Sequence, residues 1–143
     1  MRVSAIQHEL DAERDQLLAE ILTVGKAGGI PEDRLPSADP LGERVRVVME
    51  RGRRVYVLDF DDREFTTILS APTPSEFLEK VFRHATSKMA DKVYRSRMAA
   101  GLSPSEVRFD IWVQLLSGVR AEWGERLRRS KGELLGLPGS LKL

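Results

Sequence analysis

Two aspartates that follow an apolar run are the residues of this chain whose spacing most resembles a catalytic pair. Asp59 and Asp61 form an Asp-x-Asp pattern directly after residues 55–58. Phosphatases with an aspartate nucleophile use such a pair beside magnesium, one carboxylate attacking and the other transferring a proton. That chemistry needs a parallel α/β sheet with further ligands, whereas only helical patterns follow Leu69. We therefore interpret the aspartates as a solvated turn, and keep a metal-dependent hydrolase as the less favoured alternative.

The other residue types that carry catalysis show no informative spacing. His8 and His84 have no second His or Glu at i+4, the spacing that would direct two ligands at one metal. The chain has no cysteine, and neither a Gly-x-Ser-x-Gly elbow nor a glycine-rich phosphate loop occurs. The sequence therefore predicts no catalytic residue, metal or cofactor, and it favours a protein that is not an enzyme.

A row of basic residues offers a binding surface instead. Lys88, Lys92 and Arg95 fall on one side of a predicted helix, where they could bind phosphates or an acidic protein. Residues 1–43 hold four Lys/Arg against nine Asp/Glu, and residues 44–143 hold nineteen against thirteen, so an acidic first helix is expected to dock beside basic helices. The pI of 8.1 lies below that of typical nucleic-acid-binding domains, so nucleic acid is the less favoured partner.

These residues must be positioned by helices and strands of an α+β fold in a single domain, 1–143. Helical spacing predicts a first helix at about 4–25, with Ser4 and Gln7 as a capping pair. Prolines indicate a loop over 28–43 that forms either a functional surface or a strap across a sheet edge. Alternation then predicts a three-stranded antiparallel meander at about 44–50, 53–60 and 64–70, with the second strand central.

The C-terminal half is predicted to be helical. Helices are expected at about 74–100 and 104–135, the last bending near 117–120, because residues 73–76 and 103–106 both carry Ser/Thr-Pro-Ser-Glu capping signatures. They should pack on one face of the sheet, and Gln114 would need amide partners if it is buried. The predicted core includes residues from both halves: Val57, Phe82, Met89, Trp112, Leu116 and Trp123.

Cellular location is constrained by hydropathy. No run approaches the roughly 20 apolar residues of a membrane span, and the charged N-terminus lacks the apolar core of a signal peptide. We expect a soluble cytoplasmic protein.

Read from end to end, the chain resembles immunity family sixty-three, small bacterial proteins encoded beside polymorphic secreted toxins. The resemblance rests on the order of short motifs: Leu35-Pro36-Ser37, Glu50-Arg51-Gly52, Asp62-Arg63-Glu64, Phe77-Leu78, Val81-Phe82, Thr86, Met89-Ala90, Tyr94, Arg97, Arg108-Phe109, Gln114-Leu115-Leu116, Trp123 and Arg126. The chain departs from the family pattern where Arg95 follows the tyrosine and where Glu106-Val107 precede the arginine of the last helix. These changes of charge imply a different toxin from that of other members.

The resemblance implies inhibition by binding, in which the protein covers the active site or another essential surface of a cognate toxin. It implies no catalytic residue. The candidate contact residues are the basic row and part of the loop: Lys88, Lys92, Arg95, Glu32, Asp33 and Arg34. A module that binds nucleic acid or an acidic partner through the basic row is the alternative, and a homodimer through an exposed sheet face stays open.

Overall fold

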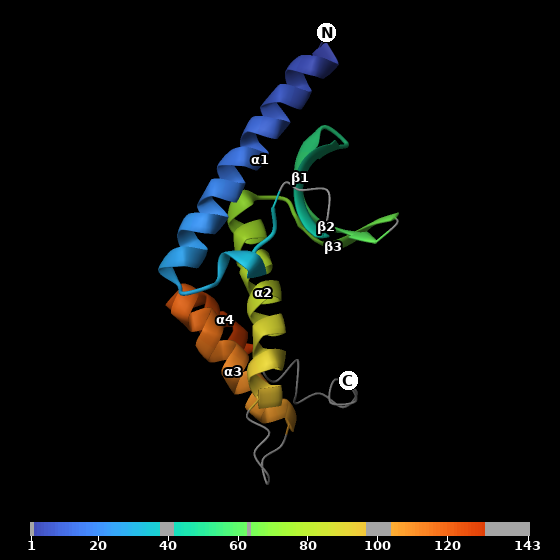
Figure 1. Ribbon diagram of the computed structural model, residues 1–143. Coiled ribbons are helices and arrows are strands. Elements are labelled where there is room, and N and C mark those ends of the chain that lie inside the picture. The colour runs from blue at the N-terminus through green and yellow to red at the C-terminus, as the bar shows by residue number, and fades with distance from the viewer. Residues whose placement is uncertain (1, 38–41, 63, 97–103, 131–143) are drawn as a thin grey trace. The chain divides into compact units, whose positions relative to one another are not determined.

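A computed structural model describes residues 2–37, 42–62, 64–96 and 104–130. It confirms the predicted α+β class: an N-terminal helix is followed by a three-stranded antiparallel sheet and then by helices (Figure 1). The chain divides into two compact units, Met1–Val81 and Phe82–Leu143. The single domain expected for 1–143 stays a prediction.

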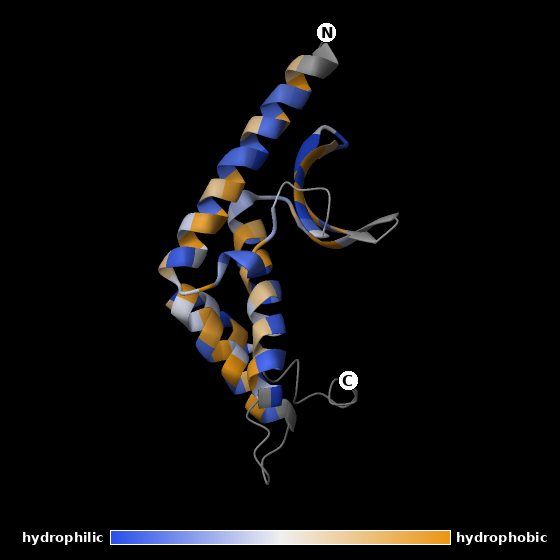
Figure 2. Ribbon diagram, in the orientation of Figure 1, coloured by the Kyte–Doolittle hydropathy of each residue, from blue (hydrophilic) through white to orange (hydrophobic). Residues whose placement is uncertain are grey.

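The first unit begins with the long helix α1, Arg2–Ala27. Leu10, Leu17 and Ile21 are buried, whereas Ile6 is 47% exposed. The capping pair expected at Ser4 and Gln7 is wrong, because α1 has already begun at Arg2 and the Gln7 amide donates to Asp11. The alternation of orange and blue along α1 and α2 in Figure 2 is that of amphipathic helices.

The sheet follows as β1 (Gly42–Glu50), β2 (Arg53–Asp62) and β3 (Glu64–Ala71), with β2 in the centre as predicted. Arg51 and Gly52 join β1 to β2 with φ angles of 51° and 77°, the left-handed pair of a tight hairpin turn. Figure 1 shows that the strands curve strongly. One face of the sheet forms the core of the first unit, with buried side chains at Val45, Val47, Tyr56 and Leu58.

Helices cover that core face within the first unit. α1 lies against β1. The helix α2, Pro74–Ser96, contributes its first residues, and the rings of Tyr56 and Phe77 lie 6.3 Å apart. Thr73 caps α2 as predicted, because its Oγ1 accepts a hydrogen bond of 3.2 Å from the Glu76 N–H. The end of α2 expected at 97–100 lies outside the described residues.

The loop at 28–43 is not wholly irregular. Residues Glu32–Arg34 form a 3-10 turn, η1. Ser37 then bridges β1 in a parallel sense: its N–H donates to the Glu43 carbonyl at 3.2 Å, and its carbonyl accepts from the Val45 N–H at 3.0 Å. Of the two alternatives for this loop, the strap along a sheet edge is therefore confirmed at Ser37, while residues 38–41 lie outside the described residues.

The second unit is formed by the rest of α2, α3 (Pro104–Val119) and α4 (Ala121–Arg129). Arg120 separates α3 from α4 with φ −147° and ψ 126°, an extended conformation that breaks the single helix expected over 104–135. Gly124 explains how closely α3 and α4 approach. A Cβ there would lie 1.7 Å from Ser117 Oγ and 2.9 Å from Ser117 Cα, so only glycine fits without a shift.

The core of the second unit contains most of the aromatic residues that the sequence singles out. Phe82 stacks on Trp123 with ring centroids 5.7 Å apart, and both are buried, as are Leu116 here and Val57 in the first unit. Two further residues expected in the core, Met89 and Trp112, are only partly buried, and Gln114 is exposed. The exposed position of Gln114 removes its need for buried amide partners.

Candidate functional site

A groove of about 500 Å³ lies between α1 and β1 in the first unit. α1 contributes Ile6, Gln7, Leu10, Asp11 and Arg14, and β1 contributes every residue from 44 to 49. Side chains of a strand alternate between the two faces of a sheet, so a groove lined by consecutive residues follows the edge of the strand rather than one face. Among the described residues outside the sheet, Ser37 alone pairs with the backbone of this edge, which is our candidate functional site.

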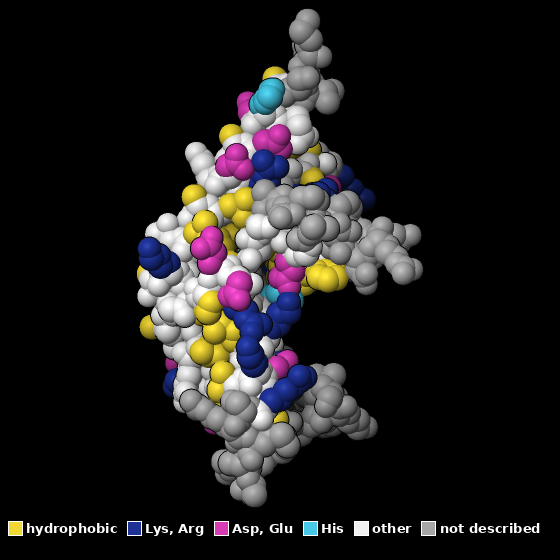
Figure 3. Space-filling view, viewed as in Figure 1, with side chains coloured by type: hydrophobic (Ala, Val, Ile, Leu, Met, Phe, Trp, Pro, Cys, Tyr) yellow, Lys and Arg dark blue, Asp and Glu magenta, His cyan; other side chains and the backbone are white. Residues whose placement is uncertain are grey.

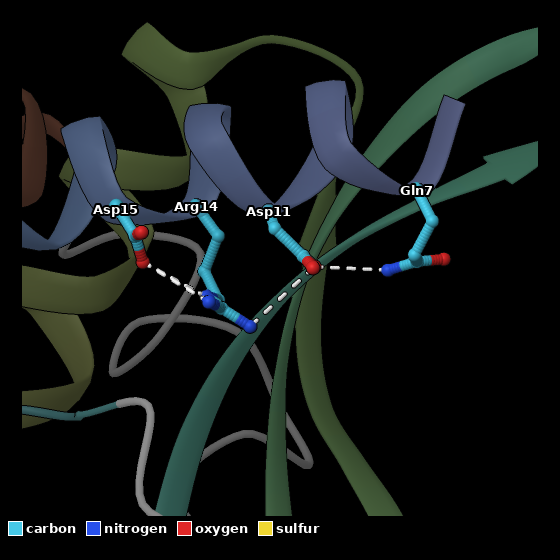
Figure 4. A network of polar contacts seen from close by, with 4 residues as sticks. All are labelled: Gln7, Asp11, Arg14 and Asp15. Atoms are coloured by element: carbon cyan, nitrogen blue, oxygen red, sulfur yellow. Dashed lines mark hydrogen bonds and ion pairs between the residues drawn. The ribbon is translucent and has the colours of Figure 1, made fainter. Parts of the chain in front are cut away.

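The helical wall of the groove carries a ladder of polar side chains. The Gln7 amide donates to Asp11 Oδ1 at 2.9 Å, and Arg14 lies 3.5 Å from the same oxygen. Arg14 also bonds to Asp15 at 3.1 Å (Figure 4). Such exposed pairs contribute little to stability. Here they constrain the positions of the side chains, because each polar side chain of the ladder is bonded to its neighbour.

The strand wall presents backbone groups that point away from β2. Backbone groups of successive residues in an edge strand point alternately towards the neighbouring strand and away from it. Because the Val45 N–H points outward to Ser37, the N–H and C=O of Val47 and Met49 also point outward, while those of Arg46 and Val48 face β2. Within the described part of the chain, no backbone hydrogen bond joins another segment to Val47 or Met49.

Asp59 lies on β2, the strand that pairs with β1, and the prediction that it stands in a solvated turn is wrong. It sits in the middle of β2 with 0% exposure, opposite Arg44 of β1. Arg46 Nε donates to Asp59 Oδ2, Arg44 Nη2 lies 3.9 Å from that oxygen, and Thr67 Oγ1 donates to Oδ1 at 3.3 Å. A buried carboxylate requires such partners. Two guanidinium groups therefore share one buried carboxylate beside the groove.

This arrangement bears on the hydrolase alternative. Arg46 and Thr67 donate hydrogen bonds to the Asp59 carboxylate. The Asp61 side chain is not among the side chains that the structure describes. Among the described residues, no three His, Cys, Asp or Glu side chains gather in a way that could hold a metal ion. The contacts of Asp59 give it the role of positioning Arg44 and Arg46.

A second cluster fixes α1 to the sheet. Glu13 accepts from Arg54 Nε at 2.5 Å and from the Tyr56 hydroxyl at 3.2 Å, and Arg54 Nη2 lies 3.3 Å from Glu9. Burial, the negative charge of Glu13 and the hydrogen bond to it raise the pKa of Tyr56. Here the basic partner of the acidic first helix is β2, whereas charge counting placed that partner in the helices. The cluster holds α1 at a fixed position along the groove.

The contact residues predicted from the sequence lie elsewhere. Lys88, Lys92 and Arg95 are exposed on α2 in the second unit, and Lys and Arg side chains lie along α2 in Figure 3. In the first unit, Glu32 and Asp33 line a smaller hollow of about 360 Å³. Arg34 ends η1 and is partly buried. Both sets stay predictions as contact surfaces.

Sequence reasoning did not identify the groove as a site. Two sequence features bear on it: Arg44 and Arg46 alternate with valines in β1, and the loop at 28–43 was predicted as a possible strap across a sheet edge. Neither feature indicates where α1 lies along β1.

Comparison with known proteins adds no family to this geometry. No family model, curated protein or solved structure matches the chain. Across the described residues, no helix is long and apolar enough to cross a membrane. The groove and the order of sequence motifs are therefore the two grounds on which a function can be proposed.

Proposed function

We propose that this chain is a cytoplasmic immunity protein that binds a cognate secreted bacterial toxin and neutralises it by covering the toxin's active site or another essential surface. The order of sequence motifs supplies the class of partner. The observation that carries the proposal is the groove between α1 and β1, which is lined by a polar ladder on α1 and by the edge of β1. Such a surface suits recognition of another protein.

The groove is suited to tight binding because its walls are already ordered. Binding costs free energy for each side chain that must be immobilised, and a surface held in place before binding avoids part of that cost. Arg14 is held by Asp11 and Asp15, and Arg46 by Asp59. Arginine is also enriched at the residues that dominate protein interfaces. An inhibitor that binds without rearranging would use such an arrangement.

Co-expression tests the proposal. The gene beside the one for this chain is expected to encode a secreted protein with a toxic C-terminal domain. That domain should arrest growth when expressed alone, and growth should recover when this chain is present. The two proteins should co-purify, and a toxin domain from an unrelated pair should not be neutralised. Continued growth arrest in the presence of well-expressed, folded chain would contradict the proposal.

The alternative function uses the basic row rather than the groove. Its support is the exposure of Lys88, Lys92 and Arg95 along one side of α2. A nucleic-acid-binding surface would show affinity that falls steeply with added salt. Reversal of the three charges to Glu separates the two functions: protection that survives the reversal removes the basic row as the toxin contact, and unchanged retention on a phosphate-rich matrix removes it as a nucleic-acid surface.

A further inference from the structure

We infer that the toxin inserts a long basic side chain, arginine or lysine, into the hollow between α1 and η1. The inference rests on the proposed function and specifies one contact of the toxin. α1 contributes Leu18 and Leu22 to the hollow, and η1 with the residues after it contributes the other wall. The volume of about 360 Å³ lies at the lower end of the range for small-ligand pockets, so the hollow suits a side chain rather than a domain.

One part of the hollow is apolar. Leu18 and Leu22 are four residues apart on α1, so they lie on the same side of the helix. Leu22 is 42% exposed, and Leu18 is only partly buried. Leu35 and Pro36 line the hollow opposite them. An aliphatic chain laid across these side chains would remove apolar surface from water, which is favourable.

The other part of the hollow is acidic. Glu32 and Asp33 line it and are exposed, and its lining contains no lysine or arginine. Within the described part of the chain neither carboxylate forms an ion pair, not even with Arg34, which follows Asp33 directly. The groove beside β1 differs, because its aspartates and arginines are paired with one another. The hollow therefore presents two negative charges that a cation on the partner would meet with charge-assisted hydrogen bonds.

This combination of surfaces selects the occupant. Arginine and lysine carry a charged group at the end of an aliphatic stem, so one side chain can cover the leucines and reach the carboxylates. A bare metal ion would use only the acids, and among the described residues no three His, Cys, Asp or Glu side chains gather to hold one. A phosphate would be repelled by both acids. Arginine is in addition one of the residues that dominate protein interfaces.

The acidic wall is in place before a partner binds. The Arg34 N–H donates to the Pro31 carbonyl and the Leu35 N–H to the Glu32 carbonyl, both at 3.0 Å, which closes η1. Pro31 and Pro36 restrict the backbone on either side of this turn. A wall that is ordered in the free protein lowers the cost of binding.

The hollow adjoins the groove, so one partner can contact both. Ser37 lines the hollow and pairs with β1, where its carbonyl accepts from the N–H of Val45, a residue that lines the groove. On α1, Arg14 lines the groove and Leu18, one turn further on, lines the hollow. The two sites therefore follow one another along the same side of α1.

Substitutions in the hollow test this contact. The double variant Glu32→Gln/Asp33→Asn removes both charges with little change of shape, and Leu22→Ala removes the exposed apolar side chain. Glu20→Gln is the matched control: Glu20 is exposed on α1 and is two residues, roughly 200° around the helix, from each leucine. Binding of each purified variant to the toxin domain from the neighbouring gene is measured by calorimetry at low and high salt. Thermal unfolding should show that all variants remain folded.

We expect the double variant to weaken binding by about 30-fold, Leu22→Ala by about fivefold and Glu20→Gln by less than about twofold. Added salt should reduce the loss in the double variant, because it screens charge, and should leave the loss for Leu22→Ala in place. Alanine substitution of the exposed lysines and arginines of the toxin, one at a time, identifies the partner residue. At one of them the substitution should weaken binding to the wild-type chain but cost little further binding to the double variant.

Wild-type affinity of the double variant, or a loss of affinity that salt does not change, would overturn this contact while leaving neutralisation intact. Failure of the wild-type chain to bind and neutralise the toxin would instead overturn the proposed function. Self-association of the chain alone that the double variant abolishes would show that a second copy supplies the basic side chain, and would equally overturn the toxin as the occupant.

Discussion

Each of the two units of this protein is stabilised internally by a different balance of apolar packing and charged pairs. In the second unit, helices pack through buried aromatic and aliphatic side chains, such as the stacked pair Phe82 and Trp123, and Trp112 Nε1 donates to Thr86 Oγ1 at 3.1 Å. In the first unit, α1 is joined to the sheet by apolar residues and also by charged pairs, Arg54 with Glu9 and Glu13. Charged pairs at a surface respond to salt and pH, while aromatic packing does not.

This difference separates scaffold from binding surface. Several residues that carry the family resemblance, including Thr86, Arg108, Phe109 and Trp123, lie in the second unit and bond or pack within it. The groove belongs to the first unit.

The largest effect should come from the aromatic core. Phe82→Ala removes a fully buried ring that stacks on Trp123, and we expect a loss of about 3–5 kcal/mol in the free energy of unfolding. Urea unfolding followed by tryptophan fluorescence measures it, and added salt should leave the loss unchanged. Gln114→Ala, on the exposed side of α3, is the control and should cost less than about 0.5 kcal/mol. A cost below about 1 kcal/mol for Phe82→Ala would contradict the packing described for α2 and α4.

A smaller effect is expected from the buried charge cluster of the first unit. Asp59→Ala leaves Arg44 and Arg46 without their carboxylate, and we expect a loss of about 2–3 kcal/mol. This is less than for a fully enclosed pair, because the arginine side chains reach solvent. Asp59→Asn keeps the shape and should cost less. Urea unfolding that shows wild-type stability for Asp59→Ala would return Asp59 to the solvated turn that its sequence context suggests.

Local sequence signals predicted most of the fold. The cap at Thr73, the Arg51-Gly52 turn and the alternation of β1 and β2 each depend on neighbouring residues, and these elements are where the sequence indicates. The break at Arg120 was anticipated only as a bend, because a long apolar stripe continues through it. Its cause is tertiary: Gly124 must approach Ser117, a contact that no local pattern reveals.

The candidate site depends still more on contacts distant in sequence. Asp59 was interpreted as a turn residue because Asp is common in turns, whereas its burial follows from Arg46, Arg44 and Thr67 on the two neighbouring strands. The groove likewise depends on where α1 and Ser37 lie along β1, and these contacts are distant in sequence. Composition and periodicity identify strands and helices, but they do not specify strand register or helix placement, and the site is made by both.

The smallest effect, and the one most specific to the first unit, concerns the Tyr56 hydroxyl. Burial and Glu13 raise the pKa of Tyr56, so the neutral phenol is favoured in the folded state. The resulting stability is present below the ordinary tyrosine pKa of about 10 and is lost as pH rises through the higher pKa of the folded state. Tyr56→Phe should cost about 1 kcal/mol at pH 7, and its difference from wild type should shrink at alkaline pH.

Glu13→Gln isolates the electrostatic part of this effect. It removes the negative charge beside the phenol while leaving an amide oxygen that can accept the same hydrogen bond. Ultraviolet titration of the phenol should then show the pKa of Tyr56 moving down towards its ordinary value, with burial keeping it from reaching that value. A Tyr56 titration that is the same in both proteins would show that the charge of Glu13 does not act on the phenol.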